Sequence, residues 1–163
     1  MLELKPEIIQ ALVDMNFVEQ YEGLSDEYAA DVIPPDERLR DIDVDTVIEI
    51  IENMGYKTSY DKKEKFFKIE CKTNNKLGLQ FNVHLVLRGG SVELIWDVEH
   101  NGIIELGPAI GYLPVLIDEK NSPIPLPAVL SYEELEEVLK INFDMFKQFQ
   151  DLLIAHYEQE ENQ

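Results

Sequence analysis

The chain has only one cysteine, Cys71, among its 163 residues. An intrachain disulfide therefore cannot form, and such a sequence is typical of a protein from a reducing compartment. Basic residues are also scarce, since 14 lysines and arginines stand against 33 acids and leave a net charge of −19. A surface of this sign repels phosphate groups, so we expect neither nucleic acid nor an anionic membrane as a partner.

Long apolar runs, targeting signals and catalytic motifs are missing as well. No stretch approaches the roughly 18 apolar residues of a membrane span, and the opening Met-Leu-Glu-Leu-Lys-Pro lacks the basic and apolar regions of a signal peptide. We therefore expect a cytoplasmic protein. The sequence contains no phosphate-binding loop, dinucleotide fingerprint, nucleophile elbow or Cys-x-x-Cys pair, so no cofactor is expected.

The most regular pattern is a pair of alternating segments joined by Gly89-Gly90. Apolar residues take every second position on both sides: Leu77, Leu79, Phe81, Val83, Leu85 and Leu87, then Val92, Leu94, Trp96 and Val98. Such alternation indicates two strands with one buried face, and two glycines suit the positive φ angles of a tight hairpin turn. The register follows, with Val83 opposite Trp96, because a one-residue slip would set apolar residues against polar ones.

Further strands are predicted on both sides of this hairpin. Alternation in 56–60 and 65–73 predicts two strands, and a three-residue loop at 74–76 leads into the hairpin. That loop length pairs Phe67 with Val83 and Cys71 with Leu79, so the thiol is expected to face the core and to be unreactive. Asn101-Gly102 predicts a turn into a fifth strand at 103–106, and 112–117 is interpreted as an edge strand.

Helices are predicted at both ends of the chain. Apolar residues at three- and four-residue spacing predict a helix over 6–21 that ends at Gly23, a short piece from Ser25 to Ala30, and a helix over 44–54. Residues 122–127 have proline at alternate positions and predict a stiff extended connector, or alternatively a proline-rich ligand for another module. Ser131 and Glu134 form a capping box that begins a long C-terminal helix.

These elements predict a single α+β domain over residues 1–163. It has N-terminal helices, an antiparallel meander of four or five strands and a long C-terminal helix packed on the sheet. Two neighbouring apolar stripes run along that helix, and so wide a face is expected to cover more than the sheet. The second contact is either the N-terminal helices or a second copy, which would form a homodimer.

The outward face of the predicted sheet carries candidate functional residues. Asp97 and Glu99 share this face with His84 in the predicted register, and Glu93 and Glu105 lie on or near it. Carboxylates beside a histidine suit a divalent metal or acid–base chemistry. The ordinary polar covering of a half-exposed sheet explains the same residues.

The first predicted hairpin is basic within an acidic protein. Residues 56–90 hold 3 acids and 8 bases, whereas 1–55 and 91–163 each hold 15 acids and 3 bases. Phe66 is expected opposite His84 on the outward face, where it is either a contact residue or covered by a helix or loop. Lys68 is expected beside Asn82, where its charge would compete with a metal.

High net charge without a catalytic motif favours a non-enzymatic protein that binds another, basic protein through an acidic surface. In size, acidity and layout the chain resembles small bacterial immunity proteins and secretion chaperones, which implies an inhibitor or chaperone of such a partner. The alternative is a small metal-dependent or acid–base enzyme that uses Asp97, Glu99 and His84.

Overall fold

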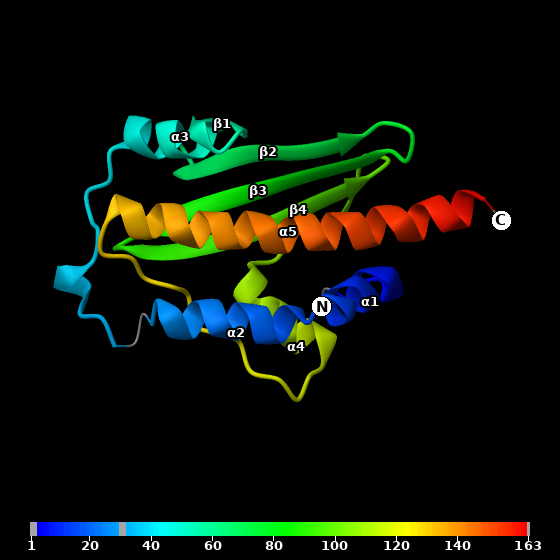
Figure 1. Ribbon diagram of the computed structural model, residues 1–163, viewed down its shortest axis with the longest axis horizontal. Coiled ribbons are helices and arrows are strands. Elements are labelled where there is room, and N and C mark those ends of the chain that lie inside the picture. The colour runs from blue at the N-terminus through cyan, green and yellow to red at the C-terminus, as the bar shows by residue number, and fades with distance from the viewer. Residues whose placement is uncertain (1–2, 30–31, 163) are drawn as a thin grey trace.

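The computed structural model describes residues 3–29 and 32–162. Helices α1 (Pro6–Asp14) and α2 (Phe17–Glu27) come first, followed by a 3₁₀ turn, η1 (Pro35–Glu37), and helix α3 (Val44–Asn53). The strands are β1 (Lys57–Asp61), β2 (Phe66–Asn74), β3 (Leu79–Arg88), β4 (Ser91–His100) and β5 (Ile103–Leu106). The turn η2 (Ile110–Tyr112), helix α4 (Leu113–Ile117) and helix α5 (Tyr132–Glu161) complete the chain, as Figure 1 shows.

The strands form one antiparallel sheet in chain order, β1-β2-β3-β4-β5, which confirms the predicted α+β meander. The β3–β4 register is the predicted one, with Val83 opposite Trp96. Gly89 and Gly90 have φ angles of 56° and 83°, the left-handed conformation that this turn requires. The apolar alternation therefore determined the pairing of the two central strands correctly.

The predicted register of β2 against β3 is wrong by two residues. Phe67 pairs with Leu85 and Ile69 pairs with Val83. Next to the loop the pairing differs from the predicted one by three residues, with Asn74 opposite Leu79, and the β-bulge between Glu70 and Lys72 reduces this difference to two. A bulge adds one residue to one strand and changes the side-chain alternation beyond it. The loop between the two strands is also longer than predicted, since β3 begins only at Leu79.

Cys71 is the extra residue of this bulge. Its side chain is half-buried and packs against the core, as predicted. Burial raises the pKa of the thiol to about 12. The thiolate is therefore not populated near neutral pH, which agrees with the expectation of an unreactive cysteine.

Two helix predictions need correction. The helix expected over 6–21 is two helices, because Asn16 adopts a left-handed conformation with φ of 55° between α1 and α2. Gly23 and Ser25 lie inside α2 and do not end or begin a helix, and the predicted end at Ala30 lies outside the described residues. Residues 112–117 form the end of η2 and α4 where an edge strand was expected; Pro114 suits the first turn of a helix.

The long connection before α5 is fixed to the domain by hydrogen bonds. The Ile124 N–H donates to the Gly111 carbonyl at 2.9 Å, and the Val92 N–H donates to the Pro127 carbonyl at 2.8 Å. The Ser131 hydroxyl then accepts the Glu134 N–H at 3.2 Å, as a capping residue should. In a capping box the Glu134 carboxylate would accept the N–H of Ser131. Here it accepts the N–H of the preceding residue, Leu130, at 2.9 Å.

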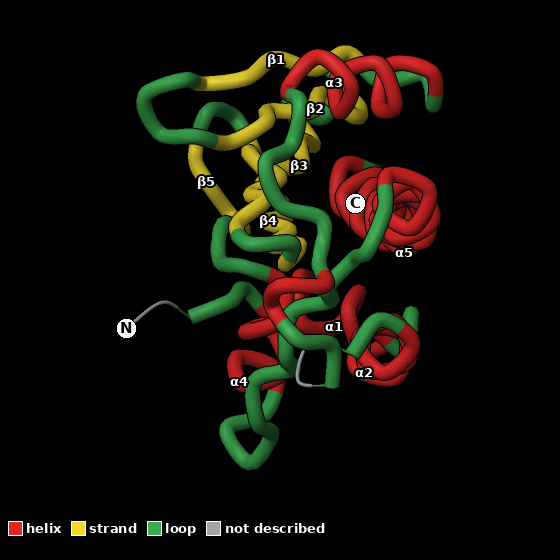
Figure 2. Tube along the Cα trace, turned by 90° about the vertical axis from the view of Figure 1, so that its left-hand side faces the viewer, coloured by secondary structure: helices red, strands yellow, loops and turns green. Residues whose placement is uncertain are grey.

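The core is centred on Trp96, whose side chain is fully buried. Its ring centroid lies 4.8 Å from that of Phe146 and 5.6 Å from that of Phe149, both on α5, and 5.3 Å from that of Phe17 on α2. The indole Nε1 donates a hydrogen bond of 2.8 Å to the Asn142 Oδ1. Figure 2 shows the resulting arrangement, with α5 across one face of the sheet, α2 beside it and α3 next to β1.

The wide apolar face of α5 is covered within the chain. Residues of both stripes, among them Leu139 and Phe149, are fully buried, and α5 contacts α1, α2 and α3 in addition to the sheet. The N-terminal helices therefore supply the second contact that this face requires. A homodimer through α5 stays a prediction.

Replacing Trp96 by alanine should lower the free energy of unfolding by about 3–5 kcal/mol, because the change empties a large buried site and leaves Asn142 without its donor. Urea unfolding followed by circular dichroism measures this change. Val13→Ala is the matched control, since the Val13 side chain is 49% exposed and should change stability little. Equal unfolding curves for Trp96→Ala and wild type would contradict the β3–β4 register.

Candidate functional site

The outer sheet face is defined here as the side of β2, β3 and β4 that points away from α5. Along β4 the inward residues from Val92 to Val98 are buried, whereas the alternate outward residues are half-exposed. Polar and charged side chains dominate the outward positions, and Figure 2 shows that side of the sheet without a covering helix among the described residues. The predicted site residues Phe66, His84, Glu93, Asp97 and Glu99 are in these positions.

A chain of hydrogen bonds joins polar side chains of β2, β3 and β4. The Thr73 hydroxyl donates to Gln80, the Gln80 Nε2 donates to the Asn82 Oδ1 at 2.9 Å, and the Asn82 Nδ2 donates to the Asp97 Oδ2 at 3.3 Å. Asn82 is only 2% exposed, although no helix of the described residues covers this face. These bonds hold the Asp97 carboxylate in one position, because each amide is oriented by the next.

His84 lies beside this chain of bonds. Its Nε2 is 3.8 Å from the Asp97 Oδ2, too far for a hydrogen bond, and this buried atom has no hydrogen-bond partner among the described residues. Lys68 is directly opposite His84 in the register, and the Phe66 ring packs on the imidazole at 4.9 Å. Burial lowers the pKa of His84; Asp97 opposes this effect and Lys68 adds to it.

The expectation of one shared face does not hold for Glu105. Its Oε1 accepts a hydrogen bond of 2.8 Å from Lys5 and lies 3.9 Å from the Nδ1 of His100. The His100 ring packs 4.4 Å from that of Tyr157 on α5, so this group is on the helix side of the sheet. Glu105 thus attaches the start of the chain to β5 and is separate from Asp97.

The chemistry available on the outer sheet face is narrower than expected from the sequence. Within residues 3–29 and 32–162, no three His, Cys, Asp or Glu side chains are placed to hold a metal ion. Lys68 was expected beside Asn82, but it lies opposite His84. Its positive charge is therefore next to the imidazole that was considered as a metal ligand. Asp97 and His84 together are a carboxylate–imidazole pair that could exchange a proton with a bound molecule.

A hollow beside the β2 bulge was missed by sequence reasoning. It has a volume of about 420 Å³, and we call it the bulge hollow. The lysines of the first hairpin indicate in the sequence that this region is positively charged. Which of them line one hollow depends on the bulge, so the hollow itself could not be predicted. The lining residues are Gly55, Lys57, Lys68, Glu70, Cys71, Lys72, Thr73, Gln80, Asn82 and Glu99.

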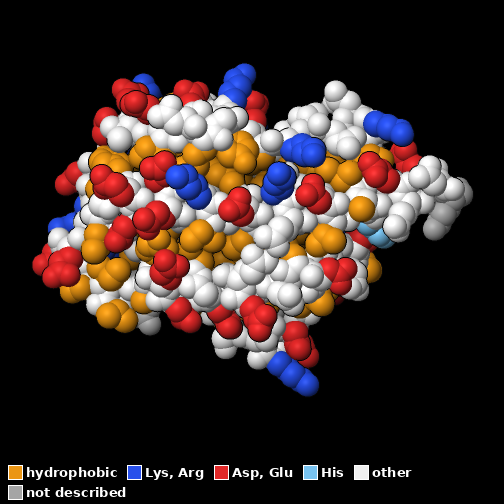
Figure 3. Space-filling model, in the orientation of Figure 1, with side chains coloured by type: hydrophobic (Ala, Val, Ile, Leu, Met, Phe, Trp, Pro, Cys, Tyr) orange, Lys and Arg blue, Asp and Glu red, His pale blue; other side chains and the backbone are white. Residues whose placement is uncertain are grey.

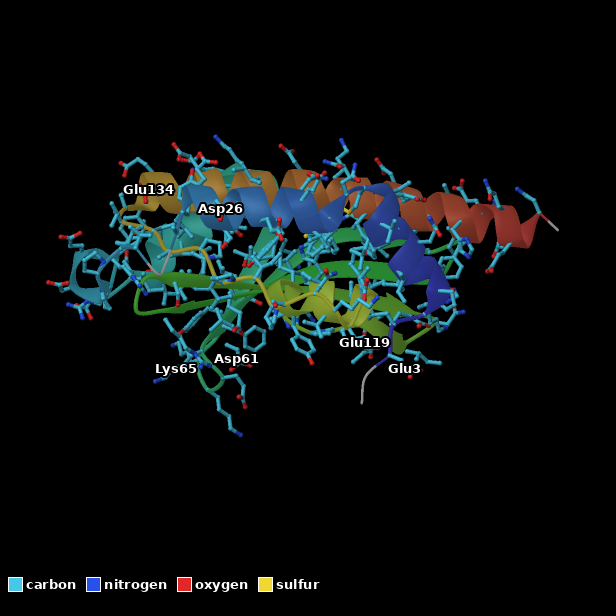
Figure 4. All side chains as sticks on the ribbon, turned by 90° about the horizontal axis from the view of Figure 1, so that it is seen from below. Glu3, Asp26, Asp61, Lys65, Glu119 and Glu134 are labelled. Atoms are coloured by element: carbon cyan, nitrogen blue, oxygen red, sulfur yellow. The ribbon has the colours of Figure 1, made fainter. Side chains whose placement is uncertain are left out.

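Acidic side chains dominate the exposed sides of α2 and α5, which we call the acidic helical surface. Four acids in α2 and nine in α5 are accompanied only by Lys140 and Lys147. Figure 3 shows acids spread over both helices with apolar side chains between them. Figure 4 places Asp26 and Glu134 on this side of the molecule and Lys65 on a turn that points the opposite way.

A groove of about 600 Å³ lies beside this surface, between α2 and residues 120–125. Glu22 and Asp26 of α2 line one wall, and Val32, which is 76% exposed, lies at the groove as well. The Ser25 hydroxyl donates to the Pro125 carbonyl at 2.8 Å and fixes the opposite wall. Apolar residues and carboxylates thus occur together at one concave site.

The half-buried imidazole of His84 should make stability depend on pH. Because the pKa of His84 in the folded protein lies below its usual 6.5, the unfolded chain binds more protons between the two values. The free energy of unfolding should therefore decrease as pH falls below about 6.5. Urea unfolding at pH 7.5 and 5.5 measures the difference.

The variant His84→Gln should show a smaller loss of stability over this interval. His156→Gln is the control, because His156 is on the exposed side of α5, next to Glu160. An unchanged pH dependence in His84→Gln, or an equal change in both variants, would refute the assignment of this effect to His84.

None of the helices in the described part of the chain combines the length and apolarity needed to cross a membrane. Comparison of the chain with protein-family models, with curated proteins and with solved structures finds no match. Its function must therefore be inferred from its own geometry and charge.

Proposed function

We propose that this protein is a non-enzymatic binding module whose acidic helical surface engages a basic protein partner. The observation that carries this proposal is the separation of charge in the fold. Acids cover α2 and α5, whereas seven lysines of residues 57–76 are on and around the β1–β2 hairpin. A basic partner would be drawn to the helices and repelled by the hairpin, so the charge pattern supports one orientation of approach.

The groove beside α2 also supports the assignment of the acidic helical surface as the binding surface. Specific interfaces combine a buried apolar centre with a polar rim. Val18, Val32 and Ile124 supply apolar contact area in the groove, Glu22 and Asp26 line its α2 wall, and Lys120 lines the opposite wall. A partner segment with an apolar residue flanked by lysine or arginine is complementary to this arrangement.

The finer proposal is that the partner is a basic toxin or effector, and that this protein acts as its inhibitor or chaperone. Acidic inhibitors of basic proteins gain a high association rate from electrostatic attraction. Such attraction is screened with a Debye length of about 8 Å at physiological ionic strength. Binding through this surface is therefore expected to weaken as salt rises.

A second candidate is an acid–base enzyme at Asp97 and His84. The observation that favours it is the unpartnered Nε2 of His84 beside a positioned carboxylate. Protein capture through α2 would not be expected from such an enzyme, so one experiment separates the two functions.

Neutralising the groove acids should weaken capture of a basic partner. In the variant Glu22→Gln/Asp26→Asn, two surface charge pairs worth about 0.2–1 kcal/mol each would be lost, so affinity should fall about 2- to 30-fold. Immobilised wild-type and variant proteins are incubated with source-cell lysate at low and high salt. Retained proteins are quantified by mass spectrometry.

The matched control is Glu49→Gln/Glu52→Gln, which makes the same change in net charge on the exposed side of α3. A basic protein that wild type and this control retain at low salt, and that the groove variant retains less, supports the proposal. Capture of no basic protein, or equal loss in both variants, would overturn it and leave the Asp97–His84 pair as the next site to test.

A further inference from the structure

Positive charge gathers at one concave site of this acidic protein, the bulge hollow. Three lysines line it, Lys57 from β1 and Lys68 and Lys72 from β2. We propose that the bulge hollow binds a small anion that carries a carboxylate or phosphate group. This site is on the sheet and is independent of the acidic helical surface.

Two of the three lysines are available for such a ligand. The Lys57 Nζ is 4.0 Å from the Glu70 Oε2, so Lys57 lies near the one acid on β2 that lines the hollow. Lys68 and Lys72 have no acidic side chain within salt-bridge distance in the described chain. Lys68 is on the outer sheet face, opposite His84, whereas Lys72 lines the hollow from the bulge itself, at the position opposite Phe81.

The floor of the hollow is preorganised. Gln80 and Asn82 are fixed by the hydrogen bonds that run from Thr73 to Asp97. The Gln80 amide uses one of its two N–H groups in this chain, and among the described residues the other has no acceptor. It can therefore donate to an anion at little cost in side-chain entropy, because the amide is already held.

The position of Glu99 limits where the anion can lie. Glu99 is on β4, opposite Gln80, so β3 separates it from Lys68 and Lys72 on β2. Neighbouring strands are about 4.8 Å apart, which puts roughly 10 Å between the two backbones. The ligand is thus expected over β2 and β3, beside the lysines, with its anionic group directed away from Glu99.

Size and charge limit the class of ligand. A volume of about 420 Å³ suits a small molecule. Extended polyanions would meet the net charge of −19 on the rest of the protein and be repelled. Cys71 lines the hollow, but its protonated thiol is not a nucleophile near neutral pH, so the site is assigned to binding and to no covalent step.

Titration with inorganic phosphate and, separately, with acetate tests the proposal. Proton–nitrogen correlation spectra of ¹⁵N-labelled protein report the side-chain amides of Gln80 and Asn82 and the backbone of 71–73. We expect saturable shifts of these signals by at least one of the two anions, and the stronger binder identifies the preferred group. Sodium chloride at the same ionic strength should not reproduce them.

The variant Lys68→Gln/Lys72→Gln should bind about tenfold or more weakly, because it removes the charge-assisted contacts. Lys62→Gln/Lys63→Gln is the matched control: it makes the same charge change in the β1–β2 turn, outside the hollow. The same spectra show whether each variant is folded. Shifts that do not saturate with either anion, or that weaken equally in both variants, would overturn the proposal.

Discussion

The fold depends on one buried contact, the packing of Trp96 of β4 against α5 with its hydrogen bond to Asn142. Burial of the aromatic ring removes apolar area from water, whereas the hydrogen bond favours one orientation of the indole relative to α5. The buried Asn142 Oδ1 accepts the indole N–H, whereas the Asn142 Nδ2 is buried without a hydrogen-bond partner among the described residues. Loss of the indole would therefore leave the whole amide unpaired, which is costly in an apolar environment. The apolar stripes place one side of the 30-residue helix on the sheet, and this polar pair favours one axial position.

The outer sheet face follows from the same contact. Because α5 and the N-terminal helices are on the Trp96 side, the opposite side has no described helix to cover it, and its polar residues bond to one another along Gln80, Asn82 and Asp97. The bulge at Cys71 interrupts the pairing of β2 with β3 for one residue, and a hollow with three lysines in its lining lies beside it. Local pairing in the sheet thus creates a basic site inside an acidic protein.

The central hairpin could be predicted to the residue, because two-residue periodicity and the Gly89-Gly90 turn leave one register that buries all apolar side chains. The β2 register could not, because the loop before β3 is longer than its residues indicate, and because nothing in the residue types of Cys71 and Lys72 marks a bulge. The break at Asn16 was equally hidden, because apolar spacing continues across it. In the candidate site, the alternation on β3 and β4 correctly placed His84, Asp97 and Glu99 on one face. The position of the Glu105 carboxylate could not be predicted, because it binds Lys5, which is 100 residues away in the sequence.

The order of the elements, with α5 after all five strands, has a consequence for biosynthesis. The inward side chains of the sheet, from Phe67 to Val98, leave the ribosome before the helix that buries them. Until the 30-residue helix α5 emerges, the nascent chain presents an incompletely covered apolar sheet, the kind of surface that chaperones bind and that aggregates. The core can therefore be completed only after α5 has been synthesised, and premature termination before Asn142 would yield a chain that lacks the residues needed to cover Trp96.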